Sequence, residues 1–250
     1  MFPKSGSSQF LLQVDKLEKR FGGFRALDGV SFDLRPGEVL GLVGPNGSGK
    51  TTCINVISGL YPGDGGQVVF EGARIDGTPM HRLARRGINR TFQSPKPFLS
   101  LTVRENVEIS ARYGHAAGEH AGKQVDLDAL LASLDLDAHA GRAAEDLNSA
   151  QQKTLDLARA LATAPRLLLV DELAAGLNPA ELSRMAVRLR GLADGGMAML
   201  VVEHLMGFID KVTDRVVVLN AGREIFGGTL AEATRDPDVV RVFLGGSHGG

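Results

Sequence analysis

The sequence lacks features that define several classes of protein. Its 250 residues contain one cysteine, Cys53, which excludes an internal disulfide and fits a reducing compartment. No apolar stretch in it approaches the roughly 18 uninterrupted residues that a membrane-spanning helix needs. Residues 1–8 hold no apolar run of the kind found in secretory signals. We therefore expect no direct membrane insertion, and we expect any attachment to a membrane to come through a partner.

An excess of charge of one sign is also lacking. The 28 lysines and arginines nearly balance the 29 aspartates and glutamates, and the sequence has no long charge run and no internal repeat. This balance argues against bulk electrostatic binding to nucleic acid or to anionic lipid. One basic cluster, formed by Arg82, Arg85, Arg86 and Arg90, is interpreted as the solvated face of a helix, so no nucleic-acid partner is predicted.

The most informative segment that is present is residues 44–52, which match the phosphate-loop pattern G-x-x-x-x-G-K-[ST]. The apolar run 39–43 before it is typical of a buried strand, and residues 53–57 after it are typical of a helix. This arrangement presents backbone N–H donors and a partial positive charge to a phosphate. Lys50 can reach the β- and γ-phosphates of a nucleotide, and the Thr51 hydroxyl can bind Mg²⁺. The predicted nucleotide-binding residues of this loop are Gly44, Pro45, Asn46, Gly47, Ser48, Gly49, Lys50, Thr51 and Thr52.

Polar residues that follow predicted strands supply the rest of a nucleotide site. Asp171 ends the apolar strand 167–170, where its carboxylate can reach Mg²⁺ directly or through water. Glu172 comes next, and in an extended segment its side chain would point away from Asp171, free to orient or deprotonate a water molecule. Gln93 can touch the metal or the water, and His204 can hydrogen-bond the γ-phosphate.

The pattern of elements divides the chain into three regions. Strand-like segments at the beginning predict an antiparallel sheet beside the nucleotide core. Residues from about 94 to 164 are mostly helical, with capping-box patterns in which Thr102 and Ser149 are the N-caps. The last third alternates strands and helices, which predicts a parallel sheet covered by helices. The expected strands are 10–14, 30–34, 67–70, 167–170, 197–202 and 216–219.

The remaining predictions concern a loop and several helices. Residues 114–122 are expected to form a loop, and residues 125–136 are expected to be helical. Asn178 is expected to be the N-cap of a helix that has Pro179 at its first position, and Thr229 is expected to cap the C-terminal helix.

Taken together, these residues resemble the ATP-binding subunit of an ABC (ATP-binding cassette) transporter. The resemblance covers about residues 11–244. It implies an α/β fold, with a P-loop NTPase (RecA-like) core, an antiparallel β-subdomain and a helical subdomain inserted at about 94–164. We expect one domain over 9–245, with flexible tails at 1–8 and 246–250. The motifs that carry the resemblance are, in order, Phe21, residues 44–51, Gln93, residues 147–151, Asp171 with Glu172, residues 175–178, and His204.

The resemblance also implies roles for single residues. Phe21 would stack on adenine, and Gln93 would bind Mg²⁺ and link the site to the membrane subunits. Glu172 would be the general base, and His204 would contact the γ-phosphate. ATP and Mg²⁺ are thus the expected cofactors, with Thr51, Gln93 and Asp171 as the residues around the metal.

The family works as a head-to-tail dimer, in which each ATP lies between one subunit's phosphate loop and the other subunit's signature helix. The expected partners are therefore transmembrane permease subunits and a second ATP-binding subunit, with this chain held peripherally at the cytoplasmic face of the inner membrane. Residues 90–93, 174–179 and 236–245 further resemble importers of branched-chain amino acids. Such importers use two different ATP-binding subunits, and this chain resembles the one with the longer helical insert.

One motif departs from the family. The signature Leu-Ser-Gly-Gly-Gln is replaced here by Leu147, Asn148, Ser149, Ala150 and Gln151. The missing glycines would let a partner's γ-phosphate approach the helix closely, and a Cβ at Ala150 narrows that approach. Two interpretations stay open: Ser149 simply caps a helix and the phosphate role is lost, or the signature still works weakly. Leu173, where the family usually has proline, is a second departure.

The leading hypothesis is an ATPase that powers a membrane transporter, with a branched-chain or related amino acid, or a small amide, as cargo. A heterodimer whose partner supplies an intact signature would keep one good ATPase site. The alternatives are a nucleotide-binding regulatory module with little hydrolysis, and a homodimeric exporter ATPase for lipid or lipopolysaccharide. A GTPase is disfavoured, because the sequence has no Asn-Lys-x-Asp string to recognise guanine.

Overall fold

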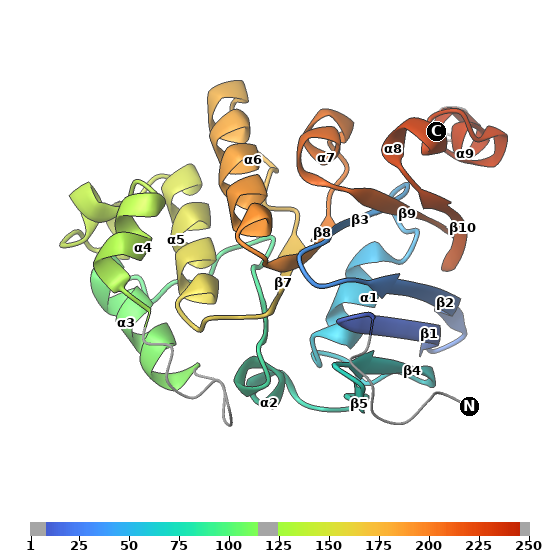
Figure 1. Ribbon diagram of the computed structural model, residues 1–250, viewed down its shortest axis with the longest axis horizontal. Coiled ribbons are helices and arrows are strands. Elements are labelled where there is room, and N and C mark those ends of the chain that lie inside the picture. Colours follow the sequence, from blue (N-terminus) through green and yellow to red (C-terminus); the bar gives the residue numbers. More distant parts are fainter. Residues whose placement is uncertain (1–8, 115–124, 246–250) are drawn as a thin grey trace.

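The computed structural model describes residues 9–114 and 125–245. It contains two sheets, which lie on either side of helix α1 (Lys50–Ile57) in Figure 1. The predicted tails 1–8 and 246–250, and residues 115–122 of the predicted loop, lie outside the described residues. Among the residues described, no helix is long and apolar enough to cross a membrane.

The first sheet is antiparallel, as predicted. Its strand order is β2-β1-β4-β5, built from β1 (Leu12–Phe21), β2 (Phe24–Leu34), β4 (Gly65–Phe70) and β5 (Ala73–Arg74). Strand β1 begins two residues later than the predicted strand 10–14 and runs seven residues further, because it pairs with β2 on one side and β4 on the other.

The second sheet is the predicted parallel sheet, with strand order β10-β9-β3-β8-β7-β6. Its strands are β3 (Val39–Val43), β6 (Ile88–Arg90), β7 (Leu167–Asp171), β8 (Ala198–Val202) and β9 (Arg215–Asn220), with β10 (Arg223–Gly228) antiparallel at one edge. Every residue of β3, β7 and β8 is buried. This full burial explains why these strands are continuous apolar runs rather than alternating ones.

Alternate residues of the parallel sheet enter two different cores. Leu167 and Leu169 of β7 join the core that includes α1 and the antiparallel sheet. Leu168 and Val170 of the same strand join the core formed with helices on the other face. The period of two along a strand therefore binds both layers to one sheet.

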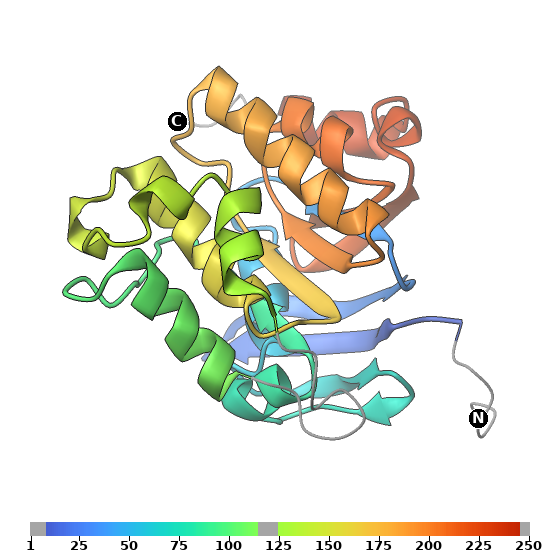
Figure 2. The same ribbon diagram turned by 60° about the vertical axis from the view of Figure 1, so that its left-hand side comes forward.

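Helices cover the outer face of the parallel sheet and extend to one side. Figure 1 shows α6 (Pro179–Asp194), α7 (Met206–Val212), α8 (Leu230–Ala233) and α9 (Pro237–Gly245) above the sheet, and α3 (Val103–Tyr113), α4 (Leu127–Ser133) and α5 (Ser149–Leu161) beside it. Figure 2, turned by 60°, shows α3, α4 and α5 gathered as one group next to α6. The short α2 (Met80–Arg85) leads into β6.

Three capping predictions are confirmed and two need correction. Thr102, Asn178 and Thr229 each form a capping box with the glutamate three residues on. The helix that Thr229 caps is the short α8, and the C-terminal helix α9 is a separate helix.

The N-cap of α5 is Asn148, not Ser149. Asn148 Oδ1 accepts from the Gln151 amide, and Gln151 Oε1 accepts from the Asn148 amide. The helix begins one residue earlier than predicted, so that Ser149 is its first residue and the Asn148 side chain reaches the third amide of the helix.

Candidate nucleotide site

The parallel sheet brings the predicted site residues to one edge. Leu42, Val202 and Asp171 stand in one row across β3, β8 and β7. The phosphate loop leaves β3 at this edge, Glu172 follows β7, and His204 follows β8 by two residues. The carboxyl edge of a parallel sheet is where such folds bind ligands.

At two positions of the loop, Gly44 and Gly49, a residue other than glycine would overlap neighbouring backbone atoms. At Gly44, a Cβ would overlap the Leu219 carbonyl oxygen and lie 2.8 Å from the Ser48 hydroxyl. At Gly49, a Cβ would lie 2.6 Å from the Ala26 carbonyl oxygen. At Gly47 nothing lies within 4 Å, although its φ of +76° is also positive. The loop thus packs tightly against β9 and β2 while its tip is open.

The polar groups of the loop fit a bound polyphosphate. Gly49 is the N-cap of helix α1 and no side chain caps that end, so the first N–H groups of the helix remain available as donors. Among the described residues, the buried Ser48 hydroxyl has no hydrogen-bond partner. Lys50 Nζ donates to the carbonyl oxygens of Gly44 and Pro45, at 2.8 and 2.9 Å. Burial lowers the pKa of Lys50, and the charge of Glu172 opposes that effect. A polyphosphate would supply the anion that these donors lack.

Asp171 is held by a buried ion pair with Arg90. Arg90 Nη2 donates to Asp171 Oδ2 at 2.8 Å, and both side chains are only 4% exposed. Burial raises the pKa of the Asp171 carboxyl, and the charge of Arg90 opposes that rise. Asp171 Oδ2 is thereby fixed by Arg90.

Arg90 corrects one sequence prediction. It is not part of a solvated helix face: it ends β6, is buried, and its guanidinium also donates to Asn55 Oδ1 and Ser58 Oγ on and beside α1, both at 2.8 Å. Arg82 and Arg85, by contrast, are exposed as predicted. The reason is that Arg90 extends the strand that pairs with β7, so its side chain enters the core where a carboxylate compensates its charge.

Glu172 and Gln93 meet in this structure. Gln93 Nε2 donates to Glu172 Oε2 at 2.6 Å, although the two residues are far apart in the sequence. The backbone of Glu172 is left-handed, with φ 45°, and so is not extended as predicted. Non-glycine residues held in this region cluster at functional sites. The turn directs the half-buried carboxylate toward Gln93.

His204 and Phe21 are both exposed. The His204 side chain is 49% exposed, and its Nδ1 lies 4.0 Å from Oε2 of the buried Glu203. Phe21 ends β1 and is 44% exposed. Its ring packs edge-on against Tyr61, with the ring centroids 5.6 Å apart. Tyr61 thus supports an aromatic surface that is open for stacking.

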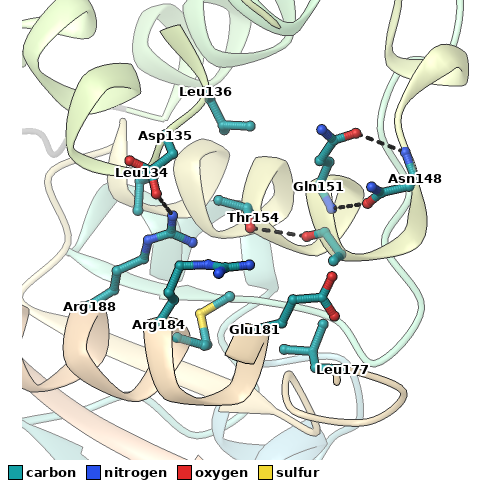
Figure 3. Close-up of a pocket in the computed structure, with 12 residues that line it drawn as sticks. Leu134, Asp135, Leu136, Asn148, Gln151, Thr154, Leu177, Glu181, Arg184 and Arg188 are labelled. Carbon is teal, nitrogen blue, oxygen red and sulfur yellow. Dashed lines mark hydrogen bonds and ion pairs between the residues drawn. The ribbon is translucent and has the colours of Figure 1, made fainter. Parts of the chain in front are cut away.

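The altered signature lies away from the phosphate loop of its own chain. Figure 1 shows its helix α5 on the other side of β7 from α1. Asn148, Ala150 and Gln151 line a pocket of about 380 Å³, whose other walls include Arg184 and Arg188 of α6 (Figure 3). Arg188 is paired with Asp135. Leu147 is buried, while Asn148 and Ser149 are exposed and so accessible to a partner.

Sequence reasoning missed several charged residues that support the site: Arg90, Lys153 and Glu203. All three are buried. The signal present in the sequence was a charged residue within or beside an otherwise apolar core segment. Because charged residues are almost never fully buried unless paired, each such position predicts a partner, but not which one.

Comparison with known proteins identifies the family. The family model described as "ABC transporter" matches residues 27–175. The chain belongs to the ABC transporter family. It is 36% identical to the high-affinity branched-chain amino acid transport ATP-binding protein LivG of Salmonella typhimurium, over 95% of this chain and 99% of that protein. It is 35% identical to BraF of Pseudomonas aeruginosa, with the same coverage of both.

Solved structures agree with this assignment. The ADP conformation of an ATP-binding cassette of an ABC transporter superposes with a TM-score of 0.84, at 32% identity, and covers 95% of this chain and 100% of that one. A nucleotide-free cassette gives a TM-score of 0.83, at 32% identity, and covers 94% of this chain and 98% of that one. The predicted P-loop NTPase fold is confirmed. The chain is an ATP-binding ABC ATPase.

The phosphate loop gives a first prediction. Gly49→Ala should weaken ATP binding by at least about tenfold, since the Cβ clash must displace the loop, whereas Gly47→Ala adds only the cost of a left-handed backbone, about 1–2 kcal/mol. Titration of a fluorescent ATP analogue, with thermal unfolding in parallel, measures both effects. Equal losses of binding in the two variants would contradict the packing argument.

The buried ion pair gives a second prediction. Arg90→Met should lower the free energy of unfolding by about 3–5 kcal/mol, because it leaves the buried Asp171 carboxylate uncompensated. Adding Asp171→Asn should recover part of that loss, while Arg85→Met on the exposed face of α2 is the matched control. Urea unfolding curves check this, and an Arg90→Met protein as stable as the control would refute it.

Proposed function

We propose that this chain binds Mg-ATP and hydrolyses it with its own phosphate loop and carboxylates. The loop donors and Lys50 would hold the β- and γ-phosphates. Thr51 and Asp171 would hold Mg²⁺, with Gln93 beside them. The bound metal would neutralise charge that develops on the transferred phosphoryl group. Phe21 and Tyr61 would take the adenine ring.

Glu172 is the proposed general base, and the observation that carries this role is its contact with Gln93 at the sheet edge. Glu172 is half-buried, and its charge acts on Lys50 by raising the pKa of that lysine. A base in this position must receive a proton from a water molecule in line with the γ-phosphate. Gln93 would release Glu172 when it turns to the metal, and His204 would contact the γ-phosphate.

We further infer that the ATPase drives import of branched-chain or related amino acids. The support is the high coverage of both chains in the matches to LivG and BraF, which their names describe as branched-chain amino acid transport proteins. The chain would sit peripherally at the cytoplasmic face of the inner membrane, bound to permease subunits.

A groove beside Gln93 is the proposed contact for the permease. Phe92, Phe98 and Tyr113 line a pocket of about 320 Å³ between α3, α5 and the segment after β6. Phe98 and Tyr113 are 47% and 70% exposed, so together they present aromatic surface that a partner could cover. A short helix of the permease lying here would press on the segment that carries Gln93.

The altered signature supports a heterodimer. Ser149 and Ala150 place two Cβ atoms where the family has glycine, at the exposed beginning of α5. A partner with an intact signature would complete the site built on this chain's phosphate loop. The opposite site, built on Asn148 and its neighbours, would be weak.

The transport function can be tested in the source organism. Deletion of this chain should abolish uptake of radiolabelled leucine, isoleucine and valine, and the wild-type chain should restore it while Glu172→Gln should not. Unchanged uptake of these amino acids, together with loss of uptake of a small amide, would overturn the proposed cargo but keep the motor. Restoration by Glu172→Gln would overturn the proposed base.

The heterodimer gives a separate prediction. Purified Glu172→Gln should remain monomeric in Mg-ATP by light scattering, since two poor signatures cannot close a homodimer. Adding Asn148→Ser, Ser149→Gly and Ala150→Gly should yield an ATP-dependent dimer. If Glu172→Gln alone pairs on addition of Mg-ATP, the chain is a self-paired motor instead.

A further inference from the structure

A buried lysine on the signature helix holds the backbone that carries Glu172. Lys153 is 5% exposed and belongs to α5. Its Nζ lies 3.4 Å from the carbonyl oxygen of Glu172, 3.1 Å from that of Leu173 and 2.5 Å from that of Ala175. An ammonium group has three N–H donors, and here all three meet one short turn of chain.

The same turn is also held by β8 and by Glu203, the residue that follows this strand. The Glu172 amide donates to the Val202 carbonyl oxygen at 2.9 Å. The Ala174 amide donates to Glu203 Oε1 at 2.6 Å. Glu203 is fully buried, and its charge acts on Lys153. Lys153 and Glu203 thus hold the carbonyl side and the amide side of one turn.

This fixation determines where the Glu172 carboxylate points. The left-handed backbone of Glu172 is a costly conformation for a residue with a Cβ, and it persists only where its surroundings impose it. The contacts of Lys153 to the carbonyl groups of Glu172, Leu173 and Ala175 supply that constraint from α5. An apolar side chain could fill the same space, but it could not satisfy three carbonyl groups.

Helix α5 also holds the segment that carries Gln93, the side chain that contacts Glu172. Asp156 Oδ2, one turn along from Lys153, accepts from the Phe92 amide at 2.8 Å, next to Gln93. One rigid helix therefore fixes both segments whose side chains meet in the contact of Gln93 with Glu172. The same helix begins at the altered signature, where a partner's nucleotide would bind.

We propose that Lys153 is a positioning residue for Glu172, which transmits the position of the signature helix to the catalytic base. This inference rests on the proposed role of Glu172 as base. It also gives the altered signature a role other than hydrolysis. Binding of the partner's nucleotide at α5 would shift Glu172, the proposed base of this chain's own site. The coupling is carried by a side chain and three carbonyl groups, without contact to ATP.

The test uses the transporter complex purified from its own membrane through a tag on this chain. Lys153→Met removes the three donors at nearly constant volume, and Lys153→Arg keeps donors and charge. Lys153→Met should lower kcat for ATP by about tenfold or more, because a small displacement of a catalytic group has effects of that size. KM for ATP should stay within about twofold, since Lys153 does not contact the phosphate loop, and Lys153→Arg should recover part of kcat.

A neighbouring residue provides the matched control. Gln152→Met alters the same helix, where Gln152 Nε2 donates to the Leu147 carbonyl oxygen at 3.2 Å and not to the turn after Glu172. It should leave kcat near the wild-type value. If Lys153→Met prevents assembly, Lys153→Gln, with two donors, takes its place in the same comparison.

A double-mutant cycle separates positioning from a general structural role. If Lys153 acts through Glu172, then Lys153→Met should cause no further loss of the residual activity once Glu172 is already Gln. An equal fold-loss in both backgrounds, or a kcat for Lys153→Met within twofold of wild type, would overturn the proposal. Failure of the function proposed above is distinct from this, because then Glu172→Gln alone would leave kcat unchanged.

Discussion

The buried ion pair between Arg90 and Asp171 is the interaction on which the nucleotide site depends. Arg90 ends β6 and joins that strand to two other elements. Its guanidinium contacts α1 through Asn55 and the adjoining Ser58, and it contacts the end of β7 through Asp171. Two charges buried together cost desolvation, so the pair persists only with good geometry and further hydrogen bonds. The planar guanidinium of Arg90 has the geometry that the ion pair needs, and it also donates the further hydrogen bonds. The phosphate loop's helix and the carboxylate predicted to face Mg²⁺ are thereby locked in one relative position.

The position of Arg90 also connects this pair to the segment that follows it. Gln93 is three residues further along the chain and contacts Glu172, while Phe92 between them is held by Asp156 of α5. A displacement of this short segment therefore changes the surroundings of both carboxylates. This arrangement suits a subunit whose hydrolysis must respond to a membrane partner, since the groove proposed for that partner lies against the same segment.

The altered signature and the residues proposed to hydrolyse ATP belong to different halves of the molecule. The proposed hydrolysis residues lie at the carboxyl edge of the parallel sheet, and the signature lies at the exposed end of α5. Substitutions at the end of α5 change what a partner meets while leaving β3, β7 and β8 untouched. Asn148 keeps the helix well capped, so the loss of the signature glycines costs no helix stability.

Much of this protein was predictable from its sequence. The phosphate loop, its flanking strand and helix, and the carboxylates after β7 lie in contiguous segments whose chemistry is local: glycines permit the turn, and successive N–H groups face inward. The two kinds of sheet followed from strand composition and from the alternation with helices. Helix ends were also predictable where one side chain caps its own helix, as at Thr102 and Asn178.

Tertiary structure alone decided which charges meet. Arg90 and Asp171 are 81 residues apart in the sequence, and Lys153 is 19 to 22 residues from the carbonyl groups that it holds. A sequence shows that a charge lies in an apolar segment, but its partner depends on which strands pair and which helix packs over them. The left-handed turn at Glu172 has the same origin, because backbone bonds from β8 and side-chain donors from α5 impose it from outside the segment. The sequence therefore determined the phosphate loop, and the tertiary structure determined the direction of Glu172, the proposed base.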